Sequence, residues 1–222
     1  MEGDILIIEE HHRRAAAQIV KMIFDKITAA PAKYIITVGG ESGSGKSETA
    51  ASIGAELKSK GINCYIFQQD DYFVYPPKTN ARAREKDTGW VGPQEVRLDL
   101  LDSHLKELKR GNNKIVKPLV IFKEDRITEE TVDLDEYGVI VAEGTYTTLL
   151  KNADTHVFID RNLNDTLEAR RKRNRETQDE FLENILTIEH NIISEHKKLA
   201  EIIITRDFDA VWNNVESQRS EV

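Results

Sequence analysis

The sequence predicts an α/β fold in which a parallel sheet is covered by helices on both faces. Three short apolar runs, Tyr34–Val38, Tyr137–Ala142 and His156–Ile159, are rich in β-branched residues and have the composition of buried parallel strands. Segments with apolar residues at helical spacing separate these runs. Such an alternation favours parallel strands joined by right-handed crossovers, because each helix returns the chain to the same edge of the sheet.

The predicted elements follow one another with few interruptions. Asp4–Glu9 is expected as a short strand, and His11–Thr28 as a helix that ends before Pro31, since the residue before proline disfavours helical geometry. Together they form an N-terminal extension, residues 1–32, to a single domain over residues 33–222. In that domain we expect strands at 34–38, 63–67, 137–142, 156–159 and 201–204, helices up to Ser59, at 98–109 and, broken once, at 164–199, a loop over 72–93, and extended structure over 115–132.

Composition limits the class of protein. The 222 residues are 39% hydrophobic and 32% charged, which is typical of a soluble globular chain. Apolar runs such as Ile5–Ile8 fall far short of the roughly 18 residues that cross a bilayer, and the acidic N-terminus does not resemble a secretory signal. The net charge of −8 argues against a general nucleic-acid surface. We therefore expect a cytoplasmic protein with no membrane and no nucleic-acid partner, and the single Cys64 excludes an internal disulfide.

A glycine-rich run follows the first strand of the domain and fits the pattern G-x-x-x-x-G-K-[S/T] at every fixed position. Glycine permits positive φ and close backbone approach, so successive N–H groups can point at phosphate oxygens, and the helix that follows directs its positive end at the same anion. The lysine would neutralise the outer phosphates of ATP, and the serine hydroxyl would ligate Mg²⁺. The residues assigned to this site are Gly40, Glu41, Ser42, Gly43, Ser44, Gly45, Lys46, Ser47 and Glu48.

Carboxylates follow two of the predicted strands, at the edge where open α/β sheets bind their ligands. Asp70 and Asp71 come after the strand at 63–67, and Glu143 comes after the strand at 137–142. Phosphoryl transfer to an alcohol needs a base near the acceptor hydroxyl and a carboxylate that helps to hold the metal. Asp70 is the candidate base and Glu143 the candidate metal ligand. The alternative is that these acids are helix caps or solvated loop residues.

A basic cluster occupies residues 170–175, on a predicted helix. Arginines spaced three and four apart share a helix face, so the cluster could close over the triphosphate and stabilise charge in the transition state. A solvated helix face paired with Glu168 and Glu176 is the alternative. The histidines show no metal-ligand spacing: His11 and His12 are adjacent, and those expected to be structural or at the surface are His104, His156, His190 and His196.

The order of these motifs, from about Tyr34 to Ile204, resembles the uridine kinase and phosphoribulokinase family of P-loop kinases. FQQDDYF at 67–73 resembles the family's strand that ends in a catalytic aspartate, and VIVAEG at 139–144 matches its strand ending in Glu-Gly. The further similarities are to the family's next helix at 99–108, its β-hairpin insert at 126–132, the start of its arginine-bearing lid at 170–171, and the entry to its last strand at 196–204. The resemblance implies a P-loop NTPase fold with that hairpin insert and lid.

The resemblance also implies roles for single residues. Asp70 would be the base, Lys46 the phosphate clamp, and Ser47 and Glu143 the holders of Mg²⁺. In the lid, Arg171 would act with a second arginine, either Arg173 or Arg175. The residues expected to face the acceptor are Asp70, Tyr72 and Arg126.

This sequence departs from the uridine kinases at the acceptor side. Those enzymes grip the nucleoside base with a Tyr-Asp-Phe and a nearby histidine, whereas the corresponding stretch here is VIFKEDR at 120–126. The tyrosine and the histidine are missing, and losing a buried polar contact changes substrate discrimination by orders of magnitude. The acceptor could therefore be a nucleoside, a sugar, a sugar phosphate or another hydroxylated metabolite. The segment Asp4–Thr28 also has no counterpart in the family's minimal form.

The leading hypothesis is an ATP- and Mg²⁺-dependent kinase that phosphorylates a hydroxyl of a small molecule. A P-loop hydrolase or switch protein that acts on a partner is the alternative. The guanine motif Asn-Lys-x-Asp and the transporter motif Leu-Ser-Gly-Gly-Gln are absent from the sequence, and the strand before Gly144 ends in Glu rather than Asp. A nucleotide-binding protein without catalysis is a third reading, against which Lys46, Ser47 and Asp70 weigh. Homo-oligomers are common in the resembling family, so self-assembly is compatible with the sequence.

Overall fold

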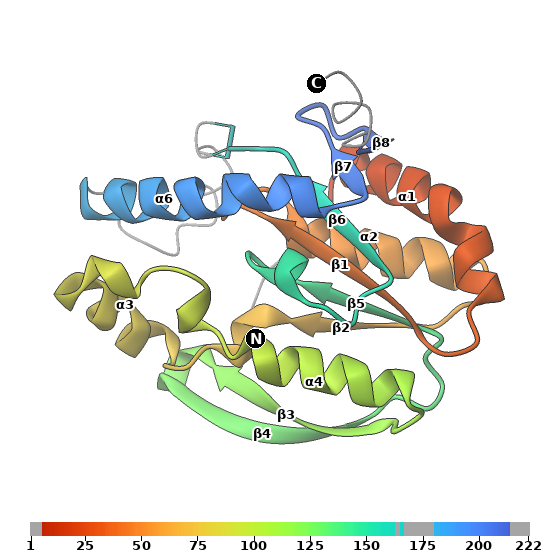
Figure 1. The fold of residues 1–222 in the computed structure, drawn as a ribbon, viewed down its shortest axis with the longest axis horizontal. Helices are drawn as coiled ribbons and strands as arrows, with labels where there is room; N and C mark the ends of the chain where they lie inside the picture. The colour runs from red at the N-terminus through yellow and green to blue at the C-terminus, as the bar shows by residue number, and fades with distance from the viewer. Residues whose placement is uncertain (1–5, 163–164, 167–179, 214–222) are drawn as a thin grey trace, which may run out of the picture.

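The computed structural model describes residues 6–162, 165–166 and 180–213 and contains one large sheet with helices around it (Figure 1). The strands are β1 Tyr34–Gly40, β2 Cys64–Gln68, β3 Lys114–Ile121, β4 Arg126–Asp133, β5 Val139–Glu143, β6 Thr155–Ile159, β7 Ile202–Ile204 and β8 Ala210–Trp212. The α-helices are α1 Glu10–Ala29, α2 Lys46–Ser59, α3 Pro77–Lys86, α4 Leu98–Lys109 and α6 Glu180–Ile193. Short 3₁₀ turns include η1 Gln69–Tyr72, η3 Pro93–Glu95 and η6 Ser194–Leu199.

The sheet has six strands in the order β2-β5-β1-β6-β7-β8. The first five are parallel, and β8 pairs antiparallel with β7 at the edge. Strands β3 and β4 form a separate antiparallel hairpin, in which Ile121 pairs with Arg126 next to the turn. This arrangement confirms the predicted parallel α/β fold and places the hairpin where an insert was expected.

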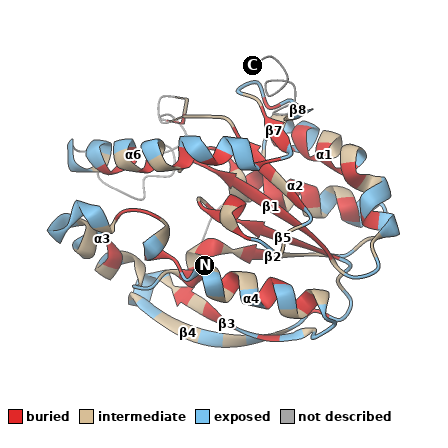
Figure 2. Cartoon of the chain, viewed as in Figure 1, coloured by how far each residue is buried: buried red, intermediate tan, exposed pale blue. Residues whose placement is uncertain are grey.

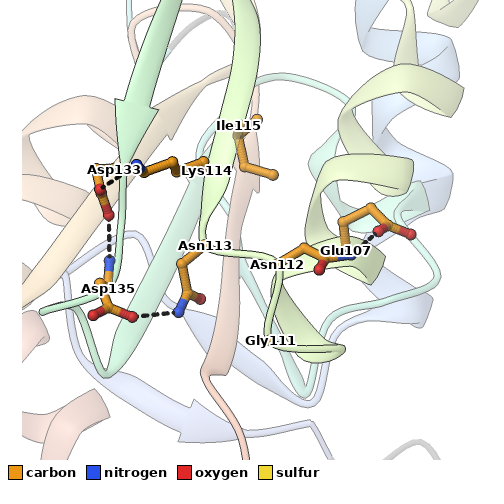
Figure 3. A pocket seen from close by; sticks show the side chains of 8 residues that line it. All are labelled: Glu107, Gly111, Asn112, Asn113, Lys114, Ile115, Asp133 and Asp135. Carbon is orange, nitrogen blue, oxygen red and sulfur yellow. Dashed lines mark hydrogen bonds and ion pairs between the residues drawn. The ribbon is translucent and has the colours of Figure 1, made fainter.

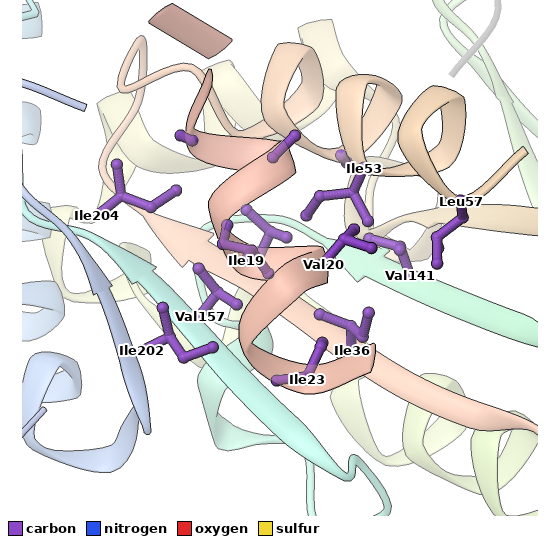
Figure 4. Packing of buried hydrophobic residues seen from close by; sticks show 14 of the residues in the cluster. Ile19, Val20, Ile23, Ile36, Ile53, Leu57, Val141, Val157, Ile202 and Ile204 are labelled. Atoms are coloured by element: carbon purple, nitrogen blue, oxygen red, sulfur yellow. The ribbon is translucent and has the colours of Figure 1, made fainter. Parts of the chain in front are cut away.

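Both faces of the sheet are covered. In β1, Ile36 and Val38 enter one buried cluster with α1 and α2, whereas Ile35 enters a second cluster with α4 and the end of α6. Figure 4 shows residues of α1 and α2 packed together against the strands, and Figure 2 shows the sheet buried between its helical layers. Strands buried on both sides are apolar throughout, which explains why the runs at 34–38 and 139–142 are continuous rather than alternating.

Three parts of the chain differ from the prediction. Residues 6–9 form no strand; instead, Glu9 caps α1 in a capping box with His12. The expected loop at 72–93 contains α3, which begins at Pro77 and buries only Asn80, so it has no apolar stripe from which it could be predicted. The short edge strand β8 was also missed. The helical stretch at 164–199 is present as α6 and η6 in its described part, and residues 163–164 and 167–179 lie outside the description.

Across the residues that the structure describes, none of the helices has both the length and the apolar composition to pass through a membrane.

Helix α1 forms part of the main core, so shortening one of its buried side chains should destabilise the whole protein. Ile19 is fully buried among α2 and strand residues, whereas Lys21 lies on the exposed side of the same helix. We expect Ile19→Ala to lower the free energy of unfolding by about 2–5 kcal/mol in urea denaturation, because it leaves a cavity. Lys21→Ala is the control and should change it by less than about 0.5 kcal/mol. Equal stabilities for the two variants would show that α1 does not contribute to the core.

Candidate active site at the carboxyl ends of the strands

Strand register brings three chain segments to one edge of the sheet. Val38 of β1 and Gln68 of β2 both pair with Glu143 of β5, so the carboxyl-terminal parts of the three strands lie side by side. The glycine-rich loop continues from β1, and η1 with Asp70 continues from β2. The predicted phosphate loop, the candidate base and the candidate metal ligand therefore come together at the edge where open α/β sheets bind their ligands.

The glycine-rich loop has the backbone geometry of a phosphate cradle. Gly40, Gly43 and Gly45 adopt φ of 147°, 75° and 97°, which residues with a side chain rarely adopt. A Cβ on Gly40 would lie 3.1 Å from the Ile159 carbonyl oxygen, so the loop also packs too tightly there for another residue. Helix α2 begins at Lys46, whose Nζ donates to the carbonyl oxygen of Glu41 at 2.9 Å, across the loop. The lysine and the helix N-terminus thus direct positive charge at one small region.

Glu143 and Ser47 meet beside this loop. Ser47 Oγ donates to Glu143 Oε1 at 3.1 Å, and the Glu143 carboxyl is buried. Burial raises the pKa of Glu143 to about 7 and the nearby Asp70 carboxylate adds to the rise, while Lys46 and the Ser47 hydroxyl oppose it. Two carboxylates held this close in a poorly solvated place favour a cation between or beside them.

The donor set fits Mg²⁺ rather than a metal that needs an all-protein cage. The described residues contain no group of three or more His, Cys, Asp or Glu side chains that could hold an ion. Magnesium in nucleotide sites takes one or two protein oxygens and completes its shell with phosphate oxygens and water. Ser47 Oγ and the carboxylate of Glu143 would supply that small set if the ion binds here.

Gln69 is a site residue that the motifs did not reveal. Its Oε1 accepts a hydrogen bond from the Tyr146 backbone N–H at 2.7 Å, and Gly144 N donates to the Val38 carbonyl oxygen at 3.1 Å. A Cβ on Gly144 would overlap the Cβ of Gln69, and Gly144 has φ of 154°. Only glycine therefore lets the end of β5 approach η1, which is the physical reason for a Glu-Gly pair at this strand end.

Asp71 points to the hairpin rather than to the phosphate loop. Its Oδ2 accepts from Lys117 Nζ at 2.9 Å and its Oδ1 from the Val120 backbone N–H at 3.0 Å. Lys117 also pairs with Glu130 on the opposite hairpin strand, at 2.8 Å. Since Asp71 and Lys117 are buried, this network fixes the hairpin onto the turn that carries Asp70. The sequence left the role of Asp71 open, and the structure gives it a structural one.

Helix α6 contacts both the glycine-rich loop and helix α3. His190 Nδ1 lies 2.6 Å from Glu41 Oε1 in the glycine-rich loop, and the neighbouring Glu189 accepts from Arg84 of α3 at 2.9 Å. Arg84 also donates to the fully buried carboxylate of Glu95. His190, which was expected to be structural or at the surface, thus contacts a phosphate-loop residue from a position 149 residues away in the chain.

Comparison with known proteins agrees with this geometry. Residues 35–211 match the model of the family described as Phosphoribulokinase / Uridine kinase. The chain belongs to this family. It is 30% identical to the uridine kinase of Clostridium novyi over 182 residues, which cover 77% of this chain and 86% of that one. It is also similar to the bifunctional alpha-galactosidase/sucrose kinase AgaSK of Mediterraneibacter gnavus, with 25% identity over 79% of this chain, and spans 20% of that longer protein.

A solved structure shares the fold at lower identity. The D-glycerate 3-kinase of Cryptococcus neoformans var. grubii superposes with a TM-score of 0.60 at 12% identity, over 92% of this chain and all of that one. Membership of the family makes the chain a phosphotransferase, a kinase that acts on a small molecule.

The family resemblance singles out further residues, and those in the described part of the chain have contacts of their own. Tyr72 is fully buried and its hydroxyl is hydrogen-bonded to His104 Nδ1 at 2.9 Å, so it is a core residue. Arg126, at the start of β4, is more than half exposed and pairs with Glu124 at 2.8 Å. The lid arginines Arg171, Arg173 and Arg175 lie outside the described residues. Glu48 is buried in the first turn of α2.

A separate hollow lies at the other end of the kinase. It is lined by the turn after α4, the start of β3 and the end of β4 (Figure 3). Its polar groups bond to one another, as in Asn113 Nδ2 to Asp135 Oδ1 at 2.6 Å. Lys33, just before β1, donates to the nearby carbonyl oxygen of Leu134, so the hollow is at the amino ends of the strands. It is therefore distinct from the site around Lys46.

The buried Glu143 carboxyl should destabilise the free enzyme. Its folded pKa of about 7 lies above the ordinary value of 4.5, so its ionisation disfavours the folded state fully above about pH 7 and not at all below about pH 4.5. We expect Glu143→Gln to raise the free energy of unfolding by about 1–3 kcal/mol at pH 8 and to change it little at pH 4.5, measured by urea denaturation. A gain that is equal at both pH values would contradict the assignment.

Proposed function

We propose that the chain is an ATP- and Mg²⁺-dependent kinase that transfers the γ-phosphoryl group to a hydroxyl of a small molecule. The observation that carries the proposal is the convergence of the glycine-rich loop, Asp70 and the buried Ser47–Glu143 pair at one edge of the sheet. Family membership supports the same reaction class. The buried network between Asp71 and the hairpin adds a rigid wall beside Asp70.

Each residue has a defined part in this proposal. Backbone N–H groups of Gly40–Ser47 bind phosphate oxygens, and Lys46 turns from the Glu41 carbonyl oxygen to the outer phosphates. Ser47 and Glu143 would hold Mg²⁺, which neutralises charge on the phosphates when it is bound. Asp70 accepts the proton of the acceptor hydroxyl while the oxygen of that hydroxyl forms a bond to the γ-phosphorus. The bond from that phosphorus to the bridging oxygen breaks, and ADP leaves.

The lid completes the proposed phosphate site. Arg171, with Arg173 or Arg175, would contact the transferred phosphoryl group and stabilise its charge. In the described part of the chain, α6 contacts the glycine-rich loop through His190 and Glu41.

The acceptor is proposed as a hydroxylated metabolite: a nucleoside, a sugar, a sugar phosphate or a related compound. The chain is similar to proteins named uridine kinase and sucrose kinase, and it shares the fold of a D-glycerate 3-kinase, each named for a hydroxylated small molecule. The stretch 120–126 lacks the tyrosine and histidine that grip a nucleoside base in uridine kinases. Phe122 stands partly exposed near the hairpin turn, where it could cover an acceptor of another shape.

The experiment is ADP release with ATP and Mg²⁺ across a panel of nucleosides, sugars, sugar phosphates and vitamin alcohols. Strong release with one acceptor class, abolished in Lys46→Ala, would support the proposal and name the acceptor class. Release that is independent of any acceptor would contradict it and favour a hydrolase or switch. ATP binding without release across the whole panel would also contradict the proposed transfer.

Asp70→Asn should separate binding from transfer. The substitution removes the proton acceptor but keeps the shape of the side chain, so we expect nucleotide affinity to stay within about threefold while kcat falls by roughly 10²–10⁴-fold. Calorimetric binding and single-turnover rates measure the two effects. Asp99→Asn, at an exposed position on α4, is the matched control and should leave both unchanged. Near-normal turnover of Asp70→Asn would show that another group accepts the proton.

A further inference from the structure

The N-terminal helix reaches the phosphate loop although it lies outside the residues that match the family. The match begins at residue 35, and α1 ends at Ala29. His12, in the first turn of α1, is 6% exposed. A Cβ placed on Gly45 would lie 2.9 Å from His12 Nε2, so the imidazole packs directly against the last glycine of the loop. Gly45 is the residue before Lys46 and the N-cap of α2.

The imidazole of His12 is held in one orientation. Its Nδ1 accepts a hydrogen bond from the Glu9 backbone N–H at 3.0 Å, and the Glu9 side chain accepts from the His12 backbone in the same capping box. A neutral ring that accepts at Nδ1 carries its proton on Nε2, the nitrogen that faces Gly45. Burial lowers the pKa of His12 to about 4 and the neighbouring His11 adds to the decrease, so the ring is neutral at neutral pH.

A second residue packs beside His12 against Gly45. Phe208 Cε1 would lie 3.4 Å from a Cβ on Gly45, and the Phe208 ring meets the His12 ring edge-on, with centroids 5.0 Å apart. Phe208 has φ of 60°, an uncommon conformation for a bulky residue. Arg161 Cζ lies over the Phe208 ring, 4.9 Å from its centroid. Gly45 thus packs against two rings from opposite ends of the chain.

Further contacts join α1 to the turn that carries Phe208. Gln18 Oε1 accepts from the Ala210 backbone N–H at 2.7 Å, and Gln18 Nε2 donates to Asp209 Oδ1 at 3.3 Å. Arg14 lies 3.3 Å from the same Asp209 carboxylate and donates to the Asp207 carbonyl oxygen. Helix α1 therefore fixes both rings at once, because it carries His12 and holds the turn with Phe208.

We propose that His12 is a positioning residue for ATP binding, which makes α1 a working part of the nucleotide site. Gly45 must keep φ near 97° for the N–H groups of the loop and of α2 to converge on one phosphate. The His12 ring occupies the space into which the loop would otherwise relax. The inference rests on the proposed function, since it concerns how the same loop binds ATP.

The test uses two substitutions that each keep one half of the imidazole. Gln places an amide N–H near the position of Nε2, against Gly45, whereas Asn places an acceptor near Nδ1, towards Glu9, and leaves the space beside Gly45 empty. His12→Ala removes both, and Arg13→Ala, at an exposed position of the same helix turn, is the control. The measurements are calorimetric Kd for ATP with Mg²⁺, KM for ATP, kcat, and the thermal unfolding temperature of the free enzyme.

We expect His12→Ala and His12→Asn to raise Kd and KM for ATP roughly tenfold, with kcat changed by less than about threefold. His12→Gln should recover most of the affinity, and Arg13→Ala should match the wild type. Even if His12→Ala does not fold, the difference in ATP affinity between His12→Gln and His12→Asn tests whether the ring nitrogen beside Gly45 positions the loop.

Two outcomes would overturn the inference: unchanged ATP affinity in folded His12→Ala or His12→Asn, or equal losses in Gln and Asn that follow their thermal stabilities. Its failure is distinct from failure of the proposed function. If Lys46→Ala abolishes ATP binding while the His12 variants bind normally, the kinase proposal stands and only the role of His12 falls. If the wild type binds no ATP, both fall.

Discussion

The parallel pairing of β5 with both β1 and β2 is the constraint on which the site depends. Because Glu143 stands level with Val38 and Gln68, the segments that continue from the neighbouring strands must begin side by side. The glycine-rich loop, the turn with Asp70 and the proposed metal-binding carboxylate are therefore placed by the sheet and not by local sequence. Gly144 makes the arrangement close enough, since any side chain there would collide with Gln69.

The buried carboxyl group of Glu143 lowers the stability of the free protein when it is ionised. Glu143 is buried, and its raised pKa reflects mainly the cost of ionising a carboxyl group away from water, with a further contribution from the nearby Asp70. The same feature makes the edge receptive to a cation that arrives with a phosphate ligand. Around it, the buried ion pair of Asp71 with Lys117 and the contact of His190 with Glu41 tie the hairpin and α6 to the reacting groups. These contacts hold in place a site in which the positive charge of Lys46 only partly offsets the burial of the Glu143 carboxyl in the free protein.

The elements that were predicted from the sequence are those determined by residues close together in the chain. The glycine pattern at 40–47, the buried strands and the amphipathic helix α4 follow from residue spacing, and the structure has them at nearly the predicted bounds. The misses have physical reasons. Helix α3 buries one polar residue and so lacks a periodic stripe, and β8 has only three residues at a sheet edge. The pairs of Gln69 with Tyr146 and of His190 with Glu41 join distant positions, which spacing along one sequence does not encode.

The most direct measurement is a crystal structure of the chain with a non-hydrolysable ATP analogue and Mg²⁺. The account predicts the triphosphate inside the Gly40–Ser47 loop, Mg²⁺ about 2.0–2.1 Å from Ser47 Oγ, and the Asp70 carboxylate facing the γ-phosphate from the acceptor side. A nucleotide bound elsewhere, or a metal that contacts neither Ser47 nor Glu143, would contradict it.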